Sequence, residues 1–178
     1  RGALDAAAGD LVIGGAINVG GGSSASGRSL TILGAHDVFL NGPIEGTGTS
    51  ASAGGVITKN STGLLHIASN SPLWAGRIGI DVGVLRISAP DALGDPNSRT
   101  LVQGGGATGK SRLELAGNVT FAPERLELTG RDIGSAPIHL SIFSGSNTWT
   151  GNSILRTRGA EYGFESTARK LTISGNVL

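Results

Sequence analysis

The chain has 178 residues, and its 14 Lys and Arg residues against 13 Asp and Glu residues give a formal net charge of +1. This balance provides no basic field for nucleic acid or anionic lipid, and the lack of cysteine excludes disulfides and cysteine-ligated metal sites. With 31 glycines and only 4% aromatic residues, the composition favours many short strands joined by tight turns.

Short apolar segments separated by Gly, Ser, Asn, Asp and Pro run along the whole chain. In chain order they begin with LVIGG, AINV, SLTILG, VFLNG, VITK and LLHIA, continue through RIGID, VLRIS, TLVQG, RLELAG and VTFA, and end with RLELTG, IHLSIF, SILRT and KLTISG. About fifteen segments in 178 residues give one about every 12 residues, which is the spacing of an all-β chain. No segment has the length and periodicity of a helix.

Two tryptophan-containing stretches repeat along the chain. LLHIASNSPLWAGRIGID and HLSIFSGSNTWTGNSILRT align with Leu65 over Leu140 and Trp74 over Trp149, at an offset of 149 − 74 = 75 in the numbering. A propeller would show blade motifs about every 40 to 50 residues, and a sandwich or closed barrel does not require such a repeat. A parallel β-helix accounts for it, because coils of roughly 20 to 25 residues stack about 4.8 Å apart.

The sequence therefore predicts an all-β fold, a right-handed parallel β-helix (β-solenoid) that forms a single segment over residues 1–178. Its internal repeats are placed at about 56–94 and 138–174. Because the chain contains no methionine, even at position 1, we expect it to be a fragment of a longer helix.

Residues 56–94 carry the more complete copy of the repeat. Ile57-Thr58-Lys59 opens it, Leu65-His66-Ile67 forms its first strand, Trp74 occupies the aromatic position and Ala92-Leu93-Gly94 closes it. This stretch resembles the autotransporter-associated β-strand repeat of bacterial surface and secreted passenger domains. The resemblance implies a passenger segment that is exported across the outer membrane of a Gram-negative-type cell and displayed or released as a parallel β-helix.

Residues 104–111 read GGGATGKS, which matches the phosphate-binding pattern G-x-x-x-x-G-K-[ST]. In a nucleotide site, Lys110 would reach the outer phosphates and a helix would begin after Ser111. The following SRLELAG instead alternates apolar and polar residues, as a strand does. We therefore interpret the stretch as a glycine-rich turn and expect no nucleotide binding.

Glu114 and Glu127 are the nearest approach to a catalytic carboxylate pair, since each lies in an RLEL tetrapeptide. A β-helix lyase or hydrolase needs carboxylates close together on one outward face. At a sequence separation of 127 − 114 = 13, the two should lie on successive faces of one coil. We expect solvated strand residues paired locally with Arg112 and Arg125.

The remaining polar candidates favour structural roles. The histidines have no zinc spacing and those in alternating strands should point outward, the Asp and Asn residues after Ser88 suit turns better than calcium ligation, and the tryptophans suit packing better than sugar stacking. The residues are His36, His66, His139, Asp91, Asp95, Asn97, Trp74 and Trp149. No catalytic, cofactor-binding or metal-binding residue is predicted, and no cofactor is expected.

We expect a non-catalytic segment of a bacterial surface-displayed or secreted passenger, located outside the cell and acting as a rigid stalk or adhesin scaffold. The alternative is a carbohydrate-active β-helix enzyme of the polysaccharide lyase or hydrolase type. Expected partners are a host glycan, a matrix protein or another copy of the chain. We expect no nucleic acid partner and no direct membrane insertion of this segment.

Overall fold

The computed structural model describes residues 1–20, 28–46, 55–103, 111–129, 138–156 and 161–178. All regular elements in these ranges are strands, and every strand pairing is parallel. The prediction of an all-β parallel solenoid is therefore confirmed. Among the described residues, no helix is long and apolar enough to cross a membrane.

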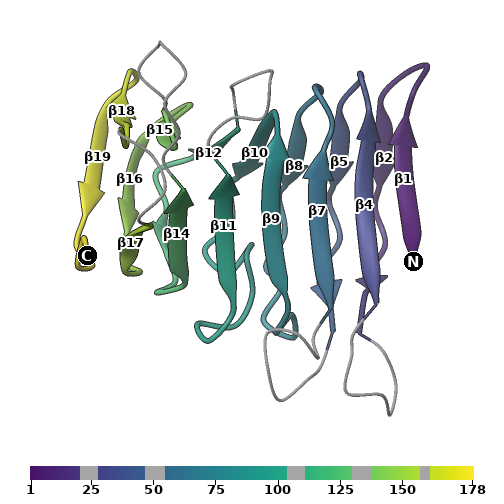
Figure 1. The fold of residues 1–178 in the computed structure, drawn as a ribbon, viewed down its shortest axis with the longest axis horizontal. Coiled ribbons are helices and arrows are strands. Elements are labelled where there is room, and N and C mark those ends of the chain that lie inside the picture. The colour runs from purple at the N-terminus through teal and green to yellow at the C-terminus, as the bar shows by residue number, and fades with distance from the viewer. Residues whose placement is uncertain (21–27, 47–54, 104–110, 130–137, 157–160) are drawn as a thin grey trace.

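Two seven-stranded sheets form the two main faces of the solenoid (Figure 1). In order, the first sheet contains β1 (Gly2–Ala6), β4 (Ser29–Gly34), β7 (Val56–Asn60), β9 (Arg77–Val82), β11 (Arg99–Gln103), β14 (Arg125–Thr129) and β17 (Ser153–Arg156). The second contains β2 (Leu11–Ile13), β5 (Val38–Leu40), β8 (Leu65–Ile67), β10 (Val84–Ile87), β12 (Arg112–Leu115), β15 (Leu140–Ile142) and β18 (Phe164–Ser166).

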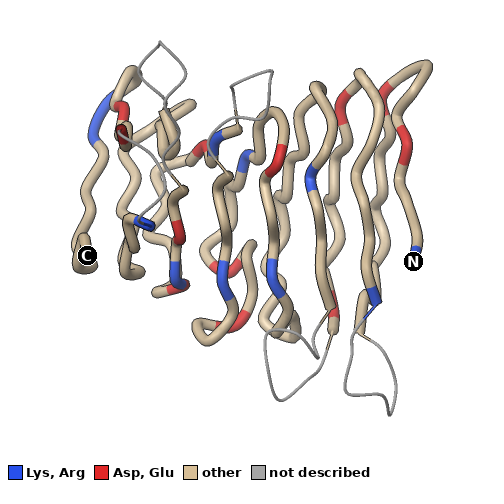
Figure 2. Tube along the Cα trace, in the orientation of Figure 1, with Lys and Arg blue, Asp and Glu red and all other residues tan. Residues whose placement is uncertain are grey.

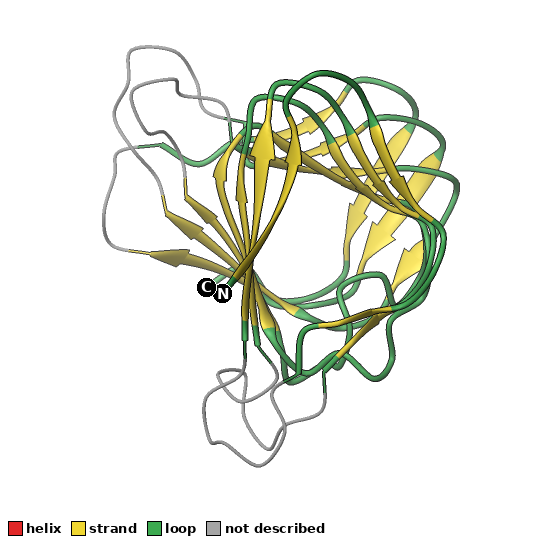
Figure 3. Cartoon of the chain, turned by 90° about the vertical axis from the view of Figure 1, so that its right-hand side faces the viewer, coloured by secondary structure: helices red, strands yellow, loops and turns green. Residues whose placement is uncertain are grey.

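A third face is made of shorter pieces. It contains the pair β3 (Ile17–Asn18) and β6 (Ile44–Glu45), and a three-stranded sheet of β13 (Thr120–Phe121), β16 (Ser146–Trp149) and β19 (Lys170–Ile173). In each coil the chain runs along a strand of the first sheet, then along a strand of the second sheet, and then along the third face. Successive coils stack along one axis. Viewed from the N-terminal end, this path runs clockwise, which makes the solenoid right-handed (Figures 1 and 3).

The interior consists largely of columns of aliphatic side chains that the parallel pairing aligns from coil to coil. In the second sheet, successive pairings align Val38, Leu65, Leu85, Leu113 and Leu140, all of them fully buried. Period-two alternation places every second residue of a strand inside, and parallel pairing stacks like on like. Burial of these columns is the main source of stability along the axis.

Polar side chains link neighbouring coils at the corners. The N–H of Asp37 donates to Oδ1 of Asp10 at 3.1 Å, and the N–H of Leu64 donates to Oδ1 of Asp37 at 2.8 Å. On another corner, Asn118 adopts a φ of 63° and its Oδ1 accepts from the N–H of Ser146 at 2.8 Å. These side chains satisfy backbone donors that leave the strand ladder at the turn.

In both copies of the repeat a glycine follows the tryptophan at a spacing of two, and this pattern has a packing cause. Trp74 and Trp149 are fully buried, which confirms the packing role predicted for them. A Cβ at Gly76 would lie 2.4 Å from the Trp74 ring, and a Cβ at Gly151 would lie 1.7 Å from the carbonyl oxygen of Glu124. Glycine is required at both positions because the chain lies directly against the neighbouring turn.

Candidate functional site: charged clusters on the outer faces

Glu127 is held by three arginines on the outer face of the first sheet. Its carboxylate lies 2.9 Å from Arg125 on the same strand, 3.5 Å from Arg99 on the preceding strand, and in an ion pair with Arg156 on the following strand. The side chain is 2% exposed. The predicted pairing with Arg125 is confirmed, but the expectation of a solvated residue is wrong, because arginines from three successive strands cover the carboxylate.

Glu114 has a similar position on the second sheet. Oε1 lies 2.6 Å from Arg112 Nη2, while Oε2 accepts from Nη2 and Nε of Arg86 at 2.8 and 3.0 Å. The predicted Arg112 pair is confirmed, and here too the expected solvation is wrong, since the side chain is 6% exposed. The two glutamates lie on different sheets, but they are not on successive faces of one coil as expected, because the third-face strand β13 comes between them in the chain.

Arg86 connects this ion pair to an aromatic patch. Its guanidinium carbon lies 3.3 Å from the centroid of the Phe143 ring, and Phe143 is 54% exposed. One strand earlier, His66 Nε2 lies 2.9 Å from Ser88 Oγ, and its ring meets Phe39 edge-on at 6.2 Å. Burial, and secondarily the Arg86 charge, lowers the pKa of His66, so the imidazole is neutral at physiological pH.

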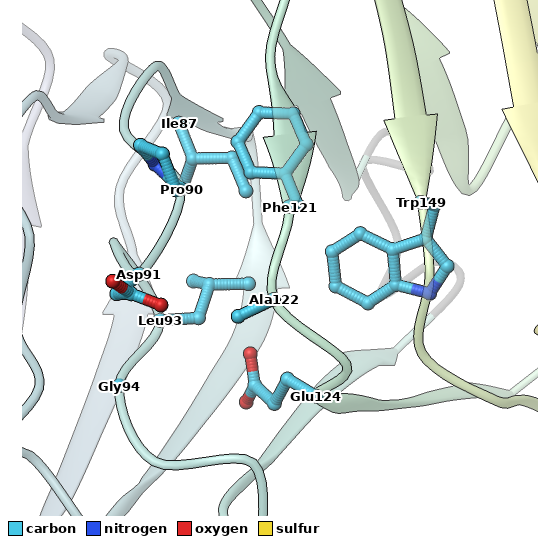
Figure 4. A pocket seen from close by; sticks show the side chains of 9 residues that line it. All are labelled: Ile87, Pro90, Asp91, Leu93, Gly94, Phe121, Ala122, Glu124 and Trp149. Atoms are coloured by element: carbon cyan, nitrogen blue, oxygen red, sulfur yellow. The ribbon is translucent and has the colours of Figure 1, made fainter.

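Glu124 was missed by sequence reasoning. Its Oε1 accepts from Thr100 Oγ1 at 3.0 Å and from Ser98 Oγ at 3.3 Å, while Oε2 has no protein partner. Figure 4 shows the carboxyl beside Ala122 and Leu93, in a cavity of about 10 Å³ that is large enough for one water at most. Burial raises the pKa of Glu124 well above its usual value, against the opposing effect of the two hydroxyl donors.

Lys59 is a second buried ionisable residue that sequence reasoning missed. Its side chain points into the solenoid in the aliphatic column between Ile32 and Ile80. The Nζ donates to the carbonyl oxygen and hydroxyl of Ser61 and, at 3.1 Å, to the carbonyl oxygen of Val82. Burial lowers the pKa of Lys59 to about 8, with Asp37 acting in the opposite direction. The alternation pattern signals its inward position, because Lys59 follows Ile57 at a spacing of two.

The other predicted positions are dispersed. Asp95 forms a turn in which Oδ1 accepts from the N–H and Nδ2 of Asn97 at 2.7 and 2.8 Å, as expected. His139 is fully buried. It precedes β15 at a corner, where Nδ1 accepts from the N–H of Gly163 at 3.2 Å and Nε2 faces the carbonyl oxygen of Thr129 at 3.4 Å.

The phosphate-loop pattern lies outside the described residues, apart from Ser111. The Ser111 hydroxyl donates to the carbonyl oxygen of Gln103, and Arg112 begins strand β12. The prediction of a strand after the pattern is therefore confirmed. In the part of the chain that the structure describes, no three His, Cys, Asp or Glu side chains form a group able to hold a metal ion.

Comparison of the chain with protein-family models, curated proteins and solved structures returns no significant match. The geometry therefore provides the grounds for a functional proposal. Among the described residues it consists of ion pairs between coils on the outer faces, buried carboxyl groups that lie apart from one another, and a mostly aliphatic interior that also contains Lys59.

Proposed function

We propose that this chain is a non-catalytic scaffold segment of a surface-displayed or secreted passenger of the autotransporter type. The observation that carries the proposal is that the buried carboxylates on the outer faces form ion pairs between coils. Glu114 and Glu127 are each neutralised by arginines from their own and neighbouring strands. A carboxylate that is buried and paired in this way links neighbouring coils and is shielded from a substrate in solution.

The stacked interior supports a mechanical role. Each coil contacts its two neighbours through parallel ladders and aliphatic columns, so the structure extends along one axis without a separate core. Such a rod holds outward side chains at a fixed spacing of about 4.8 Å. The resemblance of residues 56–94 to the autotransporter-associated repeat supports placement of this rod outside a bacterial cell.

Antibody labelling of the cells that produce this protein tests the proposed location. Antibodies raised against the 178-residue segment should label intact cells, or should bind protein released into the culture medium. Labelling that appears only after permeabilisation would contradict the proposal. Incubation of the purified segment with a panel of polysaccharides tests the absence of catalysis, and reproducible cleavage would favour the alternative of a carbohydrate-active enzyme.

A further inference from the structure

Gly79 leaves a gap in the outer column of the first sheet. Strand pairing places it between Thr58 on β7 and Leu101 on β11, at a position where neighbouring strands carry side chains. Unlike Gly76 and Gly151, Gly79 is not required by packing, because an added Cβ would meet nothing closer than Asp81 Oδ1 at 3.7 Å. The missing side chain therefore leaves a depression in the surface, and the backbone conformation does not require glycine at this position.

A hollow of about 210 Å³ surrounds this position. We call it the Gly79 hollow; its polar walls are Thr58, Arg77, Asp81, Arg99 and Gln103. It is smaller than the roughly 300–1,000 Å³ pockets that enclose drug-sized molecules. It lies on the outer face of β9 and β11 in the middle of the sheet (Figure 1), so its size suits one ring of a longer chain that continues over the surface.

One end of the hollow is cationic. Arg77 and Arg99 are directly paired on adjacent strands, and Arg125 continues the row on β14. Figure 2 shows the row as blue bands at the lower ends of β9, β11 and β14. Within the described residues Arg77 makes no ion pair, and Arg99 makes only the 3.5 Å contact with Glu127. Like charges directly opposite each other repel, and a bound anion between Arg77 and Arg99 would relieve that repulsion.

The other end offers groups that recognise hydroxyls. Asp81 Oδ1 accepts from Gln103 Nε2 at 2.8 Å, which fixes the carboxylate and the amide beside the hollow. The Asp81 charge disfavours a densely charged polyanion, so the fitting unit carries one negative charge and several hydroxyls. The hollow lies away from a sheet edge, which excludes recognition of a peptide by strand addition at this place.

We infer that the Gly79 hollow binds a carboxylate-bearing sugar unit of an acidic polysaccharide. Arg77 and Arg99 bind the carboxylate, and Asp81 and Gln103 bind the ring hydroxyls. The inference deepens the proposed adhesive scaffold and rests on it for the biological setting, while the binding itself depends only on the hollow.

Isothermal calorimetry with an oligouronate tests the inference on the complete 178-residue chain. The oligouronate should bind, and its fully methyl-esterified form should bind at least about tenfold more weakly, because the ester removes the charge that the arginines recognise. Arg77→Gln should weaken oligouronate binding by about tenfold. The matched control is Arg169→Gln, which removes the same charge from an exposed residue near the C-terminus and should leave binding unchanged.

Gly79→Val provides a second, independent variant. Valine has a higher strand propensity than glycine, and its Cβ would meet nothing closer than Asp81 Oδ1 at 3.7 Å, so this variant should fold normally, fill part of the hollow and lose binding. Equal binding by Gly79→Val or by the methyl ester would overturn the inference, as would binding only of a sulfated polysaccharide or an acidic peptide. Cleavage of the bound oligouronate would instead overturn the non-catalytic proposal and leave the binding site in place.

Discussion

Glu124 is a residue whose protonation the fold controls. It is buried and its pKa is raised, so the folded chain keeps a proton that the unfolded chain loses above its ordinary value of 4.5. The stability that depends on this proton is complete below that pH and is lost as the pH rises through the folded pKa. Glu124→Gln should therefore raise the melting temperature at pH 8 by about 2–4 °C relative to its effect at pH 4.

Thermal unfolding followed by circular dichroism at the two pH values measures this difference. Glu161→Gln is the matched control, because Glu161 is exposed and its replacement should change the melting temperature equally little at both pH values. A Glu124→Gln effect that is the same at pH 4 and pH 8 would contradict the assignment of a protonated, buried carboxyl group.

At the residue scale, the sequence predicts which arginine pairs with each glutamate better than it predicts how deeply the glutamate is buried. The local pairs of Glu114 with Arg112 and of Glu127 with Arg125 follow from alternation within one strand. Their burial does not, because the other covering arginines come from neighbouring coils that are distant in the sequence. These arginines are Arg86 for Glu114, and Arg99 and Arg156 for Glu127. Glu124 was missed for the same reason.

At the scale of the strands, Leu85 tests the assignment of inward positions, because it lies in the middle of an inward column on β10. Its side chain is fully buried between Leu65 and Leu113. Leu85→Asp places an unpaired charge in the aliphatic interior and should destabilise the chain by several kcal/mol. Chemical denaturation should show either a large decrease in the midpoint or no cooperative transition.

The control for this prediction lies on the outer side of the same sheet. Val12 on β2 is 61% exposed, so Val12→Asp should change stability by no more than about 0.5 kcal/mol. Equal effects of Leu85→Asp and Val12→Asp would contradict the assignment of inward and outward positions.

The strands could be predicted from the sequence because apolar alternation is local. The apolar segments LLHIA, RIGID and VLRIS all form strands, as their alternation predicted. The corners could not be predicted in the same way. The ladder from Asp10 to Asp37 depends on two turns that meet only after a complete coil, and no local pattern specifies which side chain accepts the next coil's N–H.

At the scale of the whole molecule, the offset between the two copies of the repeat corresponds to a whole number of coils. The pairings Leu65 with Leu85, Leu85 with Leu113 and Leu113 with Leu140 make the offset of 140 − 65 = 75 equal to three coils. The length of individual coils was less predictable. Between paired positions of the first sheet, the sequence separation varies from 77 − 56 = 21 to 30 − 2 = 28, because turns absorb insertions without disturbing the ladder.

The register between coils is the central claim, and paired cysteines test it most directly in a chain that has no cysteine of its own. Thr31 and Thr58 are direct partners on β4 and β7, at a spacing of about 4.8 Å that a disulfide can bridge. Thr31 and Leu101 are three strands apart, or about 14 Å. Oxidation at low protein concentration, followed by mass mapping, should cross-link Thr31→Cys/Thr58→Cys within one chain and leave Thr31→Cys/Leu101→Cys open. Failure of the first pair to form, or ready formation of the second, would contradict the parallel solenoid.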